Sequence, residues 1–193
     1  MTSSSELYAF AFRGFLAEEA LDGAGRQHPN LVGALDEVAA SRLGIEALDE
    51  AFVAAARPMA VVYMAVCAFE NSVRKFISAV LQDKVGDDWW EKAVSSGIKR
   101  KVESRQKEEE RIRWHSQRGT APITYTDMGD LSNIIRNNWQ HFDPPVPSIE
   151  WASSILDIIE RSRNVIMHGG LLDREDIERL GVNIRAWVKQ VGA

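Results

Sequence analysis

The sequence predicts an all-α bundle of four to five main helices with a small N-terminal helical extension. Two observations predict this fold class. Apolar residues recur at helical spacing in several long segments, as in amphipathic helices that pack on a common core. Helix-capping residues, Gly or Pro stand between these segments, where helices are expected to begin and end.

The first quarter of the chain differs from the rest, and we expect residues 1–55 to be an extension packed on a main domain of residues 56–193. Aromatic residues alternate with Ala over Tyr8–Phe12, so this stretch also allows a strand. The elements predicted in the extension are a short helix over 6–22, a loop over 21–30, and a helix over 31–43 that Gly44 caps.

The strongest helical pattern covers residues 47–83, where apolar residues keep a helical repeat for about six turns. Glu70 interrupts the inward stripe, and Arg74 follows one turn later. An inward carboxylate is costly unless it is paired. We therefore expect Glu70 and Arg74 either to neutralise each other as a structural ion pair or to face a polar cleft.

The remaining elements follow from capping residues and breakers. Pro122 disfavours a helical conformation at the residue before it, and Asp and Ser are strong N-caps. The predictions are a turn at 86–88, a charged helix from Trp89 to about Gln117, an extended stretch over 119–126, a short helix capped by Asp127, a helix capped by Ser148, and a last helix over 174–191 capped by Asp173 with Ile177, Leu180, Ile184, Trp187, Val188 and Val191 inward.

Charge is spread unevenly along the chain. The net charge of −5 argues against a general DNA-coating protein. Residues 91–118, however, contain nine Lys and Arg against five Glu, a local net charge of +4. Such a segment is either a solvated helix laced with i,i+4 pairs such as Arg105 with Glu109, which we favour, or an RNA-binding arm. In the second case the RNA-binding side chains are Lys99, Arg100, Lys101 and Arg105.

Composition limits the remaining chemistry. The single Cys67 indicates a reducing compartment. The N-terminus has no basic segment typical of a secretory signal, and the longest uncharged apolar run, Pro58–Phe69, is 12 residues, too short to span a bilayer. We expect a cytoplasmic protein without a membrane partner. No zinc spacing and no phosphate-cradling glycine loop occurs, and Asp127 and Asp130 suit helix capping, so no metal and no cofactor is expected.

One motif stands out at the end of an apolar helix. Arg163, Asn164 and His168 fall within two turns, and Gly169-Gly170 provides a stop. A guanidinium, an amide and an imidazole together can bind a phosphate and move a proton. The spacing alone is weak, because Arg136 and His141 repeat it. From spacing alone, a surface arginine and a helix-terminal histidine remain the simpler interpretation.

The chain resembles the HEPN superfamily, helical bundles named for higher eukaryote and prokaryote nucleotide binding. More narrowly, it resembles the branch found at the C-terminus of a eukaryotic nuclear endoribonuclease and in bacterial defence proteins. The matching pieces occur in order: Phe69-Glu-Asn71 with Arg74 and Ile77, Gly86-Asp-Asp-Trp-Trp90, Pro122–Asp127 through Asp130-Leu131, Ile134-Ile135, Asn138-Trp139, and Arg163-Asn164 with His168.

The resemblance implies a metal-independent endoribonuclease that works as a homodimer with a composite active site. It assigns proton transfer to His168, stabilisation of the phosphorane to Arg163 and orientation to Asn164. Glu70, Asn71 and Arg74 would line the cleft from a facing helix. Such a site requires Arg163 to be available rather than pinned in an internal ion pair. It also requires His168 to lie at a symmetric contact.

The resemblance further implies an RNA substrate and a toxin or antiviral defence role, with a neutralising antitoxin or another defence protein as partner. Toxins of the superfamily that are silenced by AMP transfer carry a Tyr two residues after the His. Here that position is Gly170, so control by this route is not expected. Two alternatives remain open: a non-catalytic RNA- or nucleotide-binding dimerisation module, and a purely structural or partner-docking domain.

Overall fold

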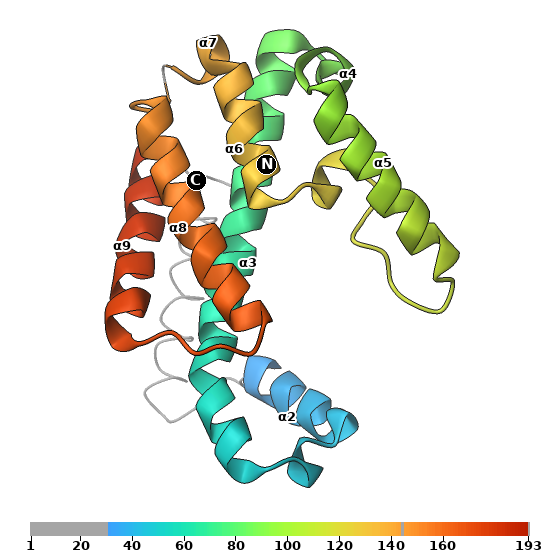
Figure 1. Ribbon diagram of the computed structural model, residues 1–193, viewed down its shortest axis with the longest axis vertical. Helices are drawn as coiled ribbons and strands as arrows, with labels where there is room; N and C mark the ends of the chain where they lie inside the picture. Colours follow the sequence, from blue (N-terminus) through green and yellow to red (C-terminus); the bar gives the residue numbers. More distant parts are fainter. Residues whose placement is uncertain (1–30, 144, 193) are drawn as a thin grey trace, which may run out of the picture. The chain divides into compact units, whose positions relative to one another are not determined.

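A computed structural model describes the backbone of residues 31–143 and 145–192 (Figure 1). All elements in these residues are helices, and no strand occurs among them. The predicted all-α class is confirmed for this part of the chain. The helix predicted over 6–22, the alternative strand at Tyr8–Phe12 and the loop over 21–30 lie outside the described residues.

The chain divides into two units, residues 1–53 and 54–193. In the first unit, α2 (Leu31–Leu43) is followed by the 3₁₀ turn η1 (Ile45–Ala47). Gly44 joins them with a φ of 64°, a left-handed conformation that glycine adopts without a Cβ penalty. The helix predicted over 31–43 and its glycine stop are confirmed. The packing of the extension on the bundle stays a prediction.

The long helix α3 (Glu50–Val85) continues through Pro58 and provides the central stripe of the bundle. Tyr63 belongs to the apolar residues of this helical repeat, yet it is 48% exposed. It lies about 100° around the helix from Val62 and so falls beside the stripe. The α3 residues buried in the core are Val62, Val66, Phe69, Val73, Ile77 and Leu81.

By length and composition alone, α3 is long and apolar enough to cross a membrane. The 18-residue stretch of α3 that meets this test includes a charged residue such as Arg57, so it is longer than the uncharged run Pro58–Phe69. Most residues of that stretch are exposed. The later turns of α3 pack in the core with α6, α8 and α9.

The charged segment is two helices rather than the one that we expected between Trp89 and Gln117. They are α4 (Trp89–Ala93) and α5 (Ser96–Arg111). Val94 between them is extended and 4% exposed, so its burial in the core breaks the helix. Ser95 then caps α5 by accepting the N–H of Ile98. The stretch over 119–126, which we expected to be extended, instead contains the 3₁₀ turn η2 (Pro122–Tyr125). Only the expectation for Ala121 is confirmed, because Pro122 disfavours a helical conformation at the residue before it.

The remaining helices are α6 (Met128–Asn137), α7 (Trp139–Phe142), α8 (Ile149–Met167) and α9 (Arg174–Val191). Three of these four begin where capping residues predict, whereas α7, which was not predicted as a separate helix, has no side-chain cap. Asp127 and Asp130 form a reciprocal capping box at α6. Ser148 caps α8 and Asp173 caps α9 through the backbone N–H groups three residues later. All three predicted caps are confirmed.

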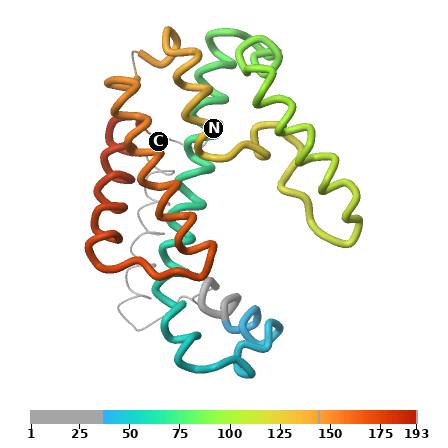
Figure 2. The backbone as a smooth tube through the Cα atoms, in the orientation of Figure 1, coloured from blue at the N-terminus to red at the C-terminus, as the bar shows by residue number. Residues whose placement is uncertain are grey.

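The helices α6, α8 and α9 lie beside the later turns of α3, and the chain reverses after α8 so that α9 runs back along it (Figure 2). Trp187 of α9 stacks on Trp151 of α8 at 5.5 Å between ring centroids. It also meets Phe69 of α3 edge-on at 5.8 Å. Ile177 and Val188 are 36% and 40% exposed, so α9 buries a narrower stripe than predicted.

Candidate functional site

A polar cleft of about 570 Å³ opens in the bundle. Its walls come from α3, α5 and the segment after it, the η2–α6 connection, and α8. Four of its side chains are guanidinium groups and two are carboxylates, so the cleft carries an excess of positive charge although the chain is acidic. The lining residues are Glu70, Asn71, Arg74, Arg105, Arg118, Thr124, Thr126, Asp127 and Arg163.

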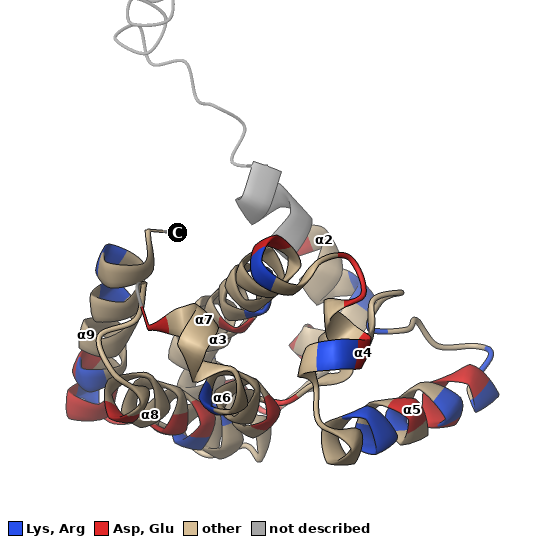
Figure 3. Cartoon of the chain, turned by 90° about the horizontal axis from the view of Figure 1, so that it is seen from above, with Lys and Arg blue, Asp and Glu red and all other residues tan. Residues whose placement is uncertain are grey.

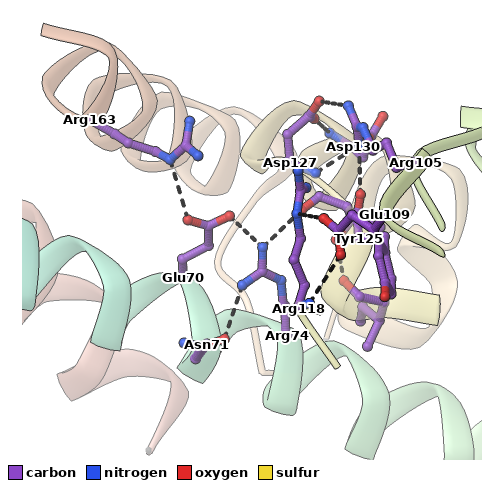
Figure 4. A network of polar contacts seen from close by, with 12 residues as sticks. Glu70, Asn71, Arg74, Arg105, Glu109, Arg118, Tyr125, Asp127, Asp130 and Arg163 are labelled. Atoms are coloured by element: carbon purple, nitrogen blue, oxygen red, sulfur yellow. Dashed lines mark hydrogen bonds and ion pairs between the residues drawn. The ribbon is translucent and has the colours of Figure 1, made fainter. Parts of the chain in front are cut away.

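Arg74 occupies the floor of the cleft and is held from three sides (Figure 4). One terminal nitrogen donates to Glu70 Oε1 at 2.5 Å and to the Thr126 carbonyl at 2.8 Å, and the other donates to Asn71 Oδ1 at 3.0 Å. Arg74 Nε is buried and finds no acceptor among the described residues. The expected Glu70–Arg74 pair therefore forms, and the same pair also faces the cleft.

Arg163 approaches Glu70 from the opposite side to Arg74 (Figure 4). Its Nε lies 3.6 Å from Glu70 Oε2, which is longer than a good hydrogen bond. The Arg163 side chain is 38% exposed, whereas that of Glu70 is 9% exposed. Among the described residues no hydrogen bond engages the two terminal nitrogens of Arg163. Arg163 is thus in an internal ion pair, but a loose one that leaves the fork of its guanidinium open to the cleft.

Asn164 and His168 lie outside this cleft, although α8 also carries Arg163. His168 is the C-cap of α8, and its backbone N–H donates to the Asn164 carbonyl at 3.2 Å. Both side chains are exposed. Four residues lie between Arg163 and His168, which corresponds to a rise of about 7.5 Å along the helix axis. Within one chain the structure groups Arg163 with Glu70, Asn71 and Arg74, and it leaves the imidazole on open surface.

The two glycines that end α8 fix the position of His168. Gly169 has a φ of 76°, in the left-handed region. The Gly170 N–H then donates to the Val165 carbonyl at 2.8 Å. A Cβ at Gly170 would lie 2.7 Å from Val165 Cγ1 and 2.9 Å from Val165 O, so no side chain fits there without a backbone shift.

Tyr63 is a further ionisable group near Arg163. Its pKa is raised, first by a hydrogen bond with Cys67, then by repulsion from the ionised form of that thiol and by burial, while the positive charge of Arg163 acts in the opposite direction. Tyr63, Cys67 and Glu70 follow one another at helical spacing on α3. The phenol of Tyr63 therefore adds an exposed proton-bearing group to the Arg163 side of the site.

Comparison with known proteins decides the family. A family model described as Swt1-like HEPN matches residues 65–192, about two thirds of the chain, and includes every residue of the cleft as well as His168. The chain belongs to the Swt1-like HEPN family. Domains of this family are generally of ribonuclease type. No protein of curated function and no solved structure matches the chain.

In this HEPN domain the four predicted RNA-binding cations have different surroundings. Lys99 pairs with Glu91, and Lys101 with Asp130. Arg105 bonds to Asp127 and Asp130 rather than to Glu109, because these carboxylates cap α6 beside α5 and Asp130 is 1% exposed. Arg100 is exposed and has no ion pair among the described residues. Positive and negative side chains are interspersed along α5 (Figure 3). The ion pairs of its described residues run to other segments and not to i,i+4 partners within the helix, so the laced pattern that we favoured is not found.

Sequence reasoning missed the part of the HEPN cleft that a loop provides. Arg118, Thr124 and Thr126 line it because the chain returns from α5 through η2 to the start of α6. The PITYTD stretch was the available signal, since Thr126 stands directly before the Asp127 cap. No pattern in the sequence places Arg118 there. Among the described residues no group of three or more His, Cys, Asp or Glu side chains is arranged to hold a metal ion.

Proposed function

We propose that this HEPN protein is a metal-independent endoribonuclease that acts as a homodimer in a toxin or antiviral defence role. The observation that carries the proposal is the pairing of an open arginine cleft with an unengaged histidine at the end of the same helix. Arg74 is committed to Glu70 and Thr126, but the terminal nitrogens of Arg163 face the cleft. A planar guanidinium of this kind matches a phosphate in a bidentate way.

A second copy supplies what one chain lacks. Large apolar side chains are exposed near His168, and the Leu172 N–H lies 3.3 Å from Met59 Sδ, which places the end of α8 beside the first turns of α3 within this unit. Exposed apolar side chains of this kind are typical of a protein interface. Within three residues of His168 these are Val165, Met167 and Leu171. Contact through them brings two copies of His168 to one site.

The chemistry follows from these groups. One imidazole removes the proton from the ribose 2′-OH, and the 2′-oxygen attacks the adjacent phosphorus. The P–O5′ bond breaks, and the leaving oxygen takes a proton from a second imidazole. Arg163 stabilises the negative charge of the phosphorane, and Asn164 orients the imidazole or the phosphate. The products are a 2′,3′-cyclic phosphate and a 5′-OH, and no step uses a metal ion.

The decisive experiment is RNA cleavage in the presence of EDTA. We expect His168→Ala to lower kcat/KM by about 10²- to 10⁴-fold, the usual contribution of general acid–base catalysis. His141→Ala is the matched control, because it removes the histidine of the duplicate spacing and should leave cleavage unchanged. Equal activity of wild type and His168→Ala, or strict dependence on Mg²⁺, would overturn the proposal. Growth inhibition on expression, compared for the same two variants, tests the toxin role.

Two observations favour a second function, that of a non-catalytic RNA- or nucleotide-binding dimerisation module. Arg163 contacts Glu70, and His168 lies outside the cleft. A module of this kind would bind RNA in a salt-dependent way and leave it intact. RNA binding by wild type without any cleavage at high protein concentration would favour this alternative over the ribonuclease.

A further inference from the structure

A second cleft adjoins the polar cleft lined by Arg74 and Arg163, called the arginine cleft below. It has a volume of about 490 Å³ and lies where the chain leaves α5. The two clefts share Arg105 and Arg118, so these side chains form a common wall. The second cleft is lined by Arg105, Glu108, Glu109, Ile112, Trp114, His115, Ser116 and Arg118.

An aromatic pair stands at the open side of this cleft. Trp114 is 86% exposed, more than any other large hydrophobic side chain in the described residues. Its indole meets the His115 ring at 5.7 Å between centroids with an interplanar angle of 77°. The His115 Nδ1 lies 2.9 Å from the Ser116 carbonyl and must donate to it, which directs the proton of the neutral ring to Nδ1 and leaves Nε2 as an acceptor.

The segment that presents Trp114 is braced at both sides. The His115 N–H donates to the Ile112 carbonyl at 3.2 Å, which closes a turn around Trp114. Further along, the Arg118 N–H donates to Glu109 Oε2 at 3.1 Å, and the Tyr125 hydroxyl donates to the Gly119 carbonyl at 3.0 Å. Hydrogen bonds therefore fix the turn that carries Trp114, and the indole extends from it into solvent.

The shared wall contains one cation that can reach a phosphate. Arg105 already donates to the Tyr125 carbonyl and to the Asp127 and Asp130 carboxylates. Arg118 is 53% exposed and engages Glu109 through Nε at 2.7 Å, with its guanidinium 5.9 Å from the centre of the Tyr125 ring. The two terminal nitrogens of Arg118 have no hydrogen-bond partner among the described residues.

We propose that Trp114 is a stacking platform for a nucleobase of single-stranded RNA, with Arg118 holding the phosphate between that base and the arginine cleft. An exposed aromatic face beside a guanidinium in a polar cleft is how proteins bind unpaired bases without reading their sequence. The inference rests on the proposed function, since it places the nucleotide next to the linkage that would be cut. It also gives the substrate class, because a base paired in a duplex has no free face to stack.

The test uses His168→Ala as the parent, so that binding is measured without cleavage. The probes are a labelled single-stranded RNA decamer and a decamer of the same length with abasic ribose throughout. We expect Trp114→Ala to weaken binding of the first probe about 5- to 100-fold and Trp114→Phe to restore most of it. Neither variant should change binding of the abasic probe. Val182→Ala, at an exposed position of α9, is the control.

Equal affinity of Trp114→Ala and Trp114→Phe for the base-containing probe would overturn the inference. Equal loss on both probes would also overturn it, because the side chain would then act on the backbone or the fold. The proposed enzymatic function fails separately, if wild type binds RNA in a Trp114-dependent way but never cleaves it. No binding of either probe by the parent would overturn both.

Discussion

At the residue scale, the site depends on Glu70, a buried carboxylate between two arginines. Its Oε1 accepts from Arg74 at 2.5 Å, and its Oε2 lies 3.6 Å from Arg163. The short contact fixes Arg74 in the floor of the cleft, whereas the long one holds Arg163 only weakly. A phosphate that enters the cleft competes with Glu70 for Arg163 and not for Arg74. Glu70 thus gives the two arginines different roles: Arg74 is fixed in the structure, and Arg163 is left available to a phosphate.

Replacing this carboxylate should separate stability from RNA affinity. In Glu70→Gln the amide oxygen still accepts from Arg74, but the charge is lost, and we expect the free energy of unfolding to fall by about 1–3 kcal/mol. RNA binding should tighten about fivefold or more, because removal of one like charge near a phosphate is worth at least about 1 kcal/mol. Denaturant unfolding and RNA titration measure the two effects.

Glu178→Gln is the matched control for this prediction. Glu178 also pairs with an arginine, Arg174, at 2.9 Å on α9, but both side chains are exposed. Such a surface pair contributes little, so the variant should change neither stability nor RNA affinity appreciably. If Glu70→Gln weakened RNA binding instead, Glu70 would be supporting the bound state rather than competing with it.

At the element scale, α8 matters most, because it carries Arg163 near its end and His168 at its cap. Its start is fixed by Ser148, whose Oγ accepts the Trp151 N–H at 3.1 Å. We expect Ser148→Ala to lower the free energy of unfolding by about 1 kcal/mol, the usual cost of losing an N-cap. Ser154→Ala, at an exposed position inside α8, should be neutral or slightly stabilising. Equal effects of the two substitutions in denaturant unfolding would contradict the capping role.

The start of α6 makes stability depend on pH. Burial alone would raise the pKa of Asp127, but the Asp130 N–H and the Arg105 guanidinium outweigh it, and the pKa is lowered below 3.8. The stabilisation is therefore present above the unfolded-state pKa of about 4 and is lost as the pH falls through the lower folded-state value. As the pH is lowered below about 4, the free energy of unfolding should fall less steeply for Asp127→Asn than for wild type. Parallel curves for the two proteins would contradict this.

What could be predicted from sequence depended on how local the cause was. Asp127, Ser148 and Asp173 act on amides three residues away, so their caps and the helices they begin were predicted correctly. The break at Val94 was not, because it follows from burial of that side chain in a core built by distant segments. Arg105 was assigned to Glu109 at helical spacing, yet Asp127 and Asp130, more than twenty residues away, bind it.

For the candidate site, too, contacts between distant segments were harder to predict than local features. Glu70, Asn71, Arg74 and Arg163 were predicted to share a cleft and do so, because the family resemblance carried the long-range information that spacing lacks. Arg118, Thr124 and Thr126 were missed, since only the folded loop brings them to the same walls. His168 was placed correctly at the end of its helix, but it is exposed and lies outside the cleft that Arg163 lines.

At the scale of the whole molecule, the proposed mechanism requires the exposed apolar side chains around His168 to form a contact between two copies. Met167, next to that histidine, is 52% exposed. We expect Met167→Glu to give a monomer by sedimentation and to lose RNA cleavage, because a charge at a buried interface is strongly unfavourable. Val182→Glu, at a 57% exposed position of α9, should remain dimeric and active. The specific activity of wild type should rise with protein concentration until the dimer is complete.

A wild-type protein that sediments as a monomer at all concentrations yet cleaves RNA would remove the second copy from the mechanism. Cleavage by Met167→Glu at the wild-type rate would have the same meaning, since the substituted side chain lies beside the histidine. Loss of cleavage with the dimer intact would instead place Met167 in the site itself.

The closed turn after α8 also restricts how this lineage can evolve. The Gly170 amide is bonded to Val165, and a Cβ there would meet that residue at 2.7 and 2.9 Å. Substitution of Gly170 by tyrosine would therefore not by itself provide an acceptor for AMP, because the main chain would first have to take another route out of the helix. An inhibitor of the proposed ribonuclease would therefore have to act elsewhere, by covering the cleft or by keeping two copies apart.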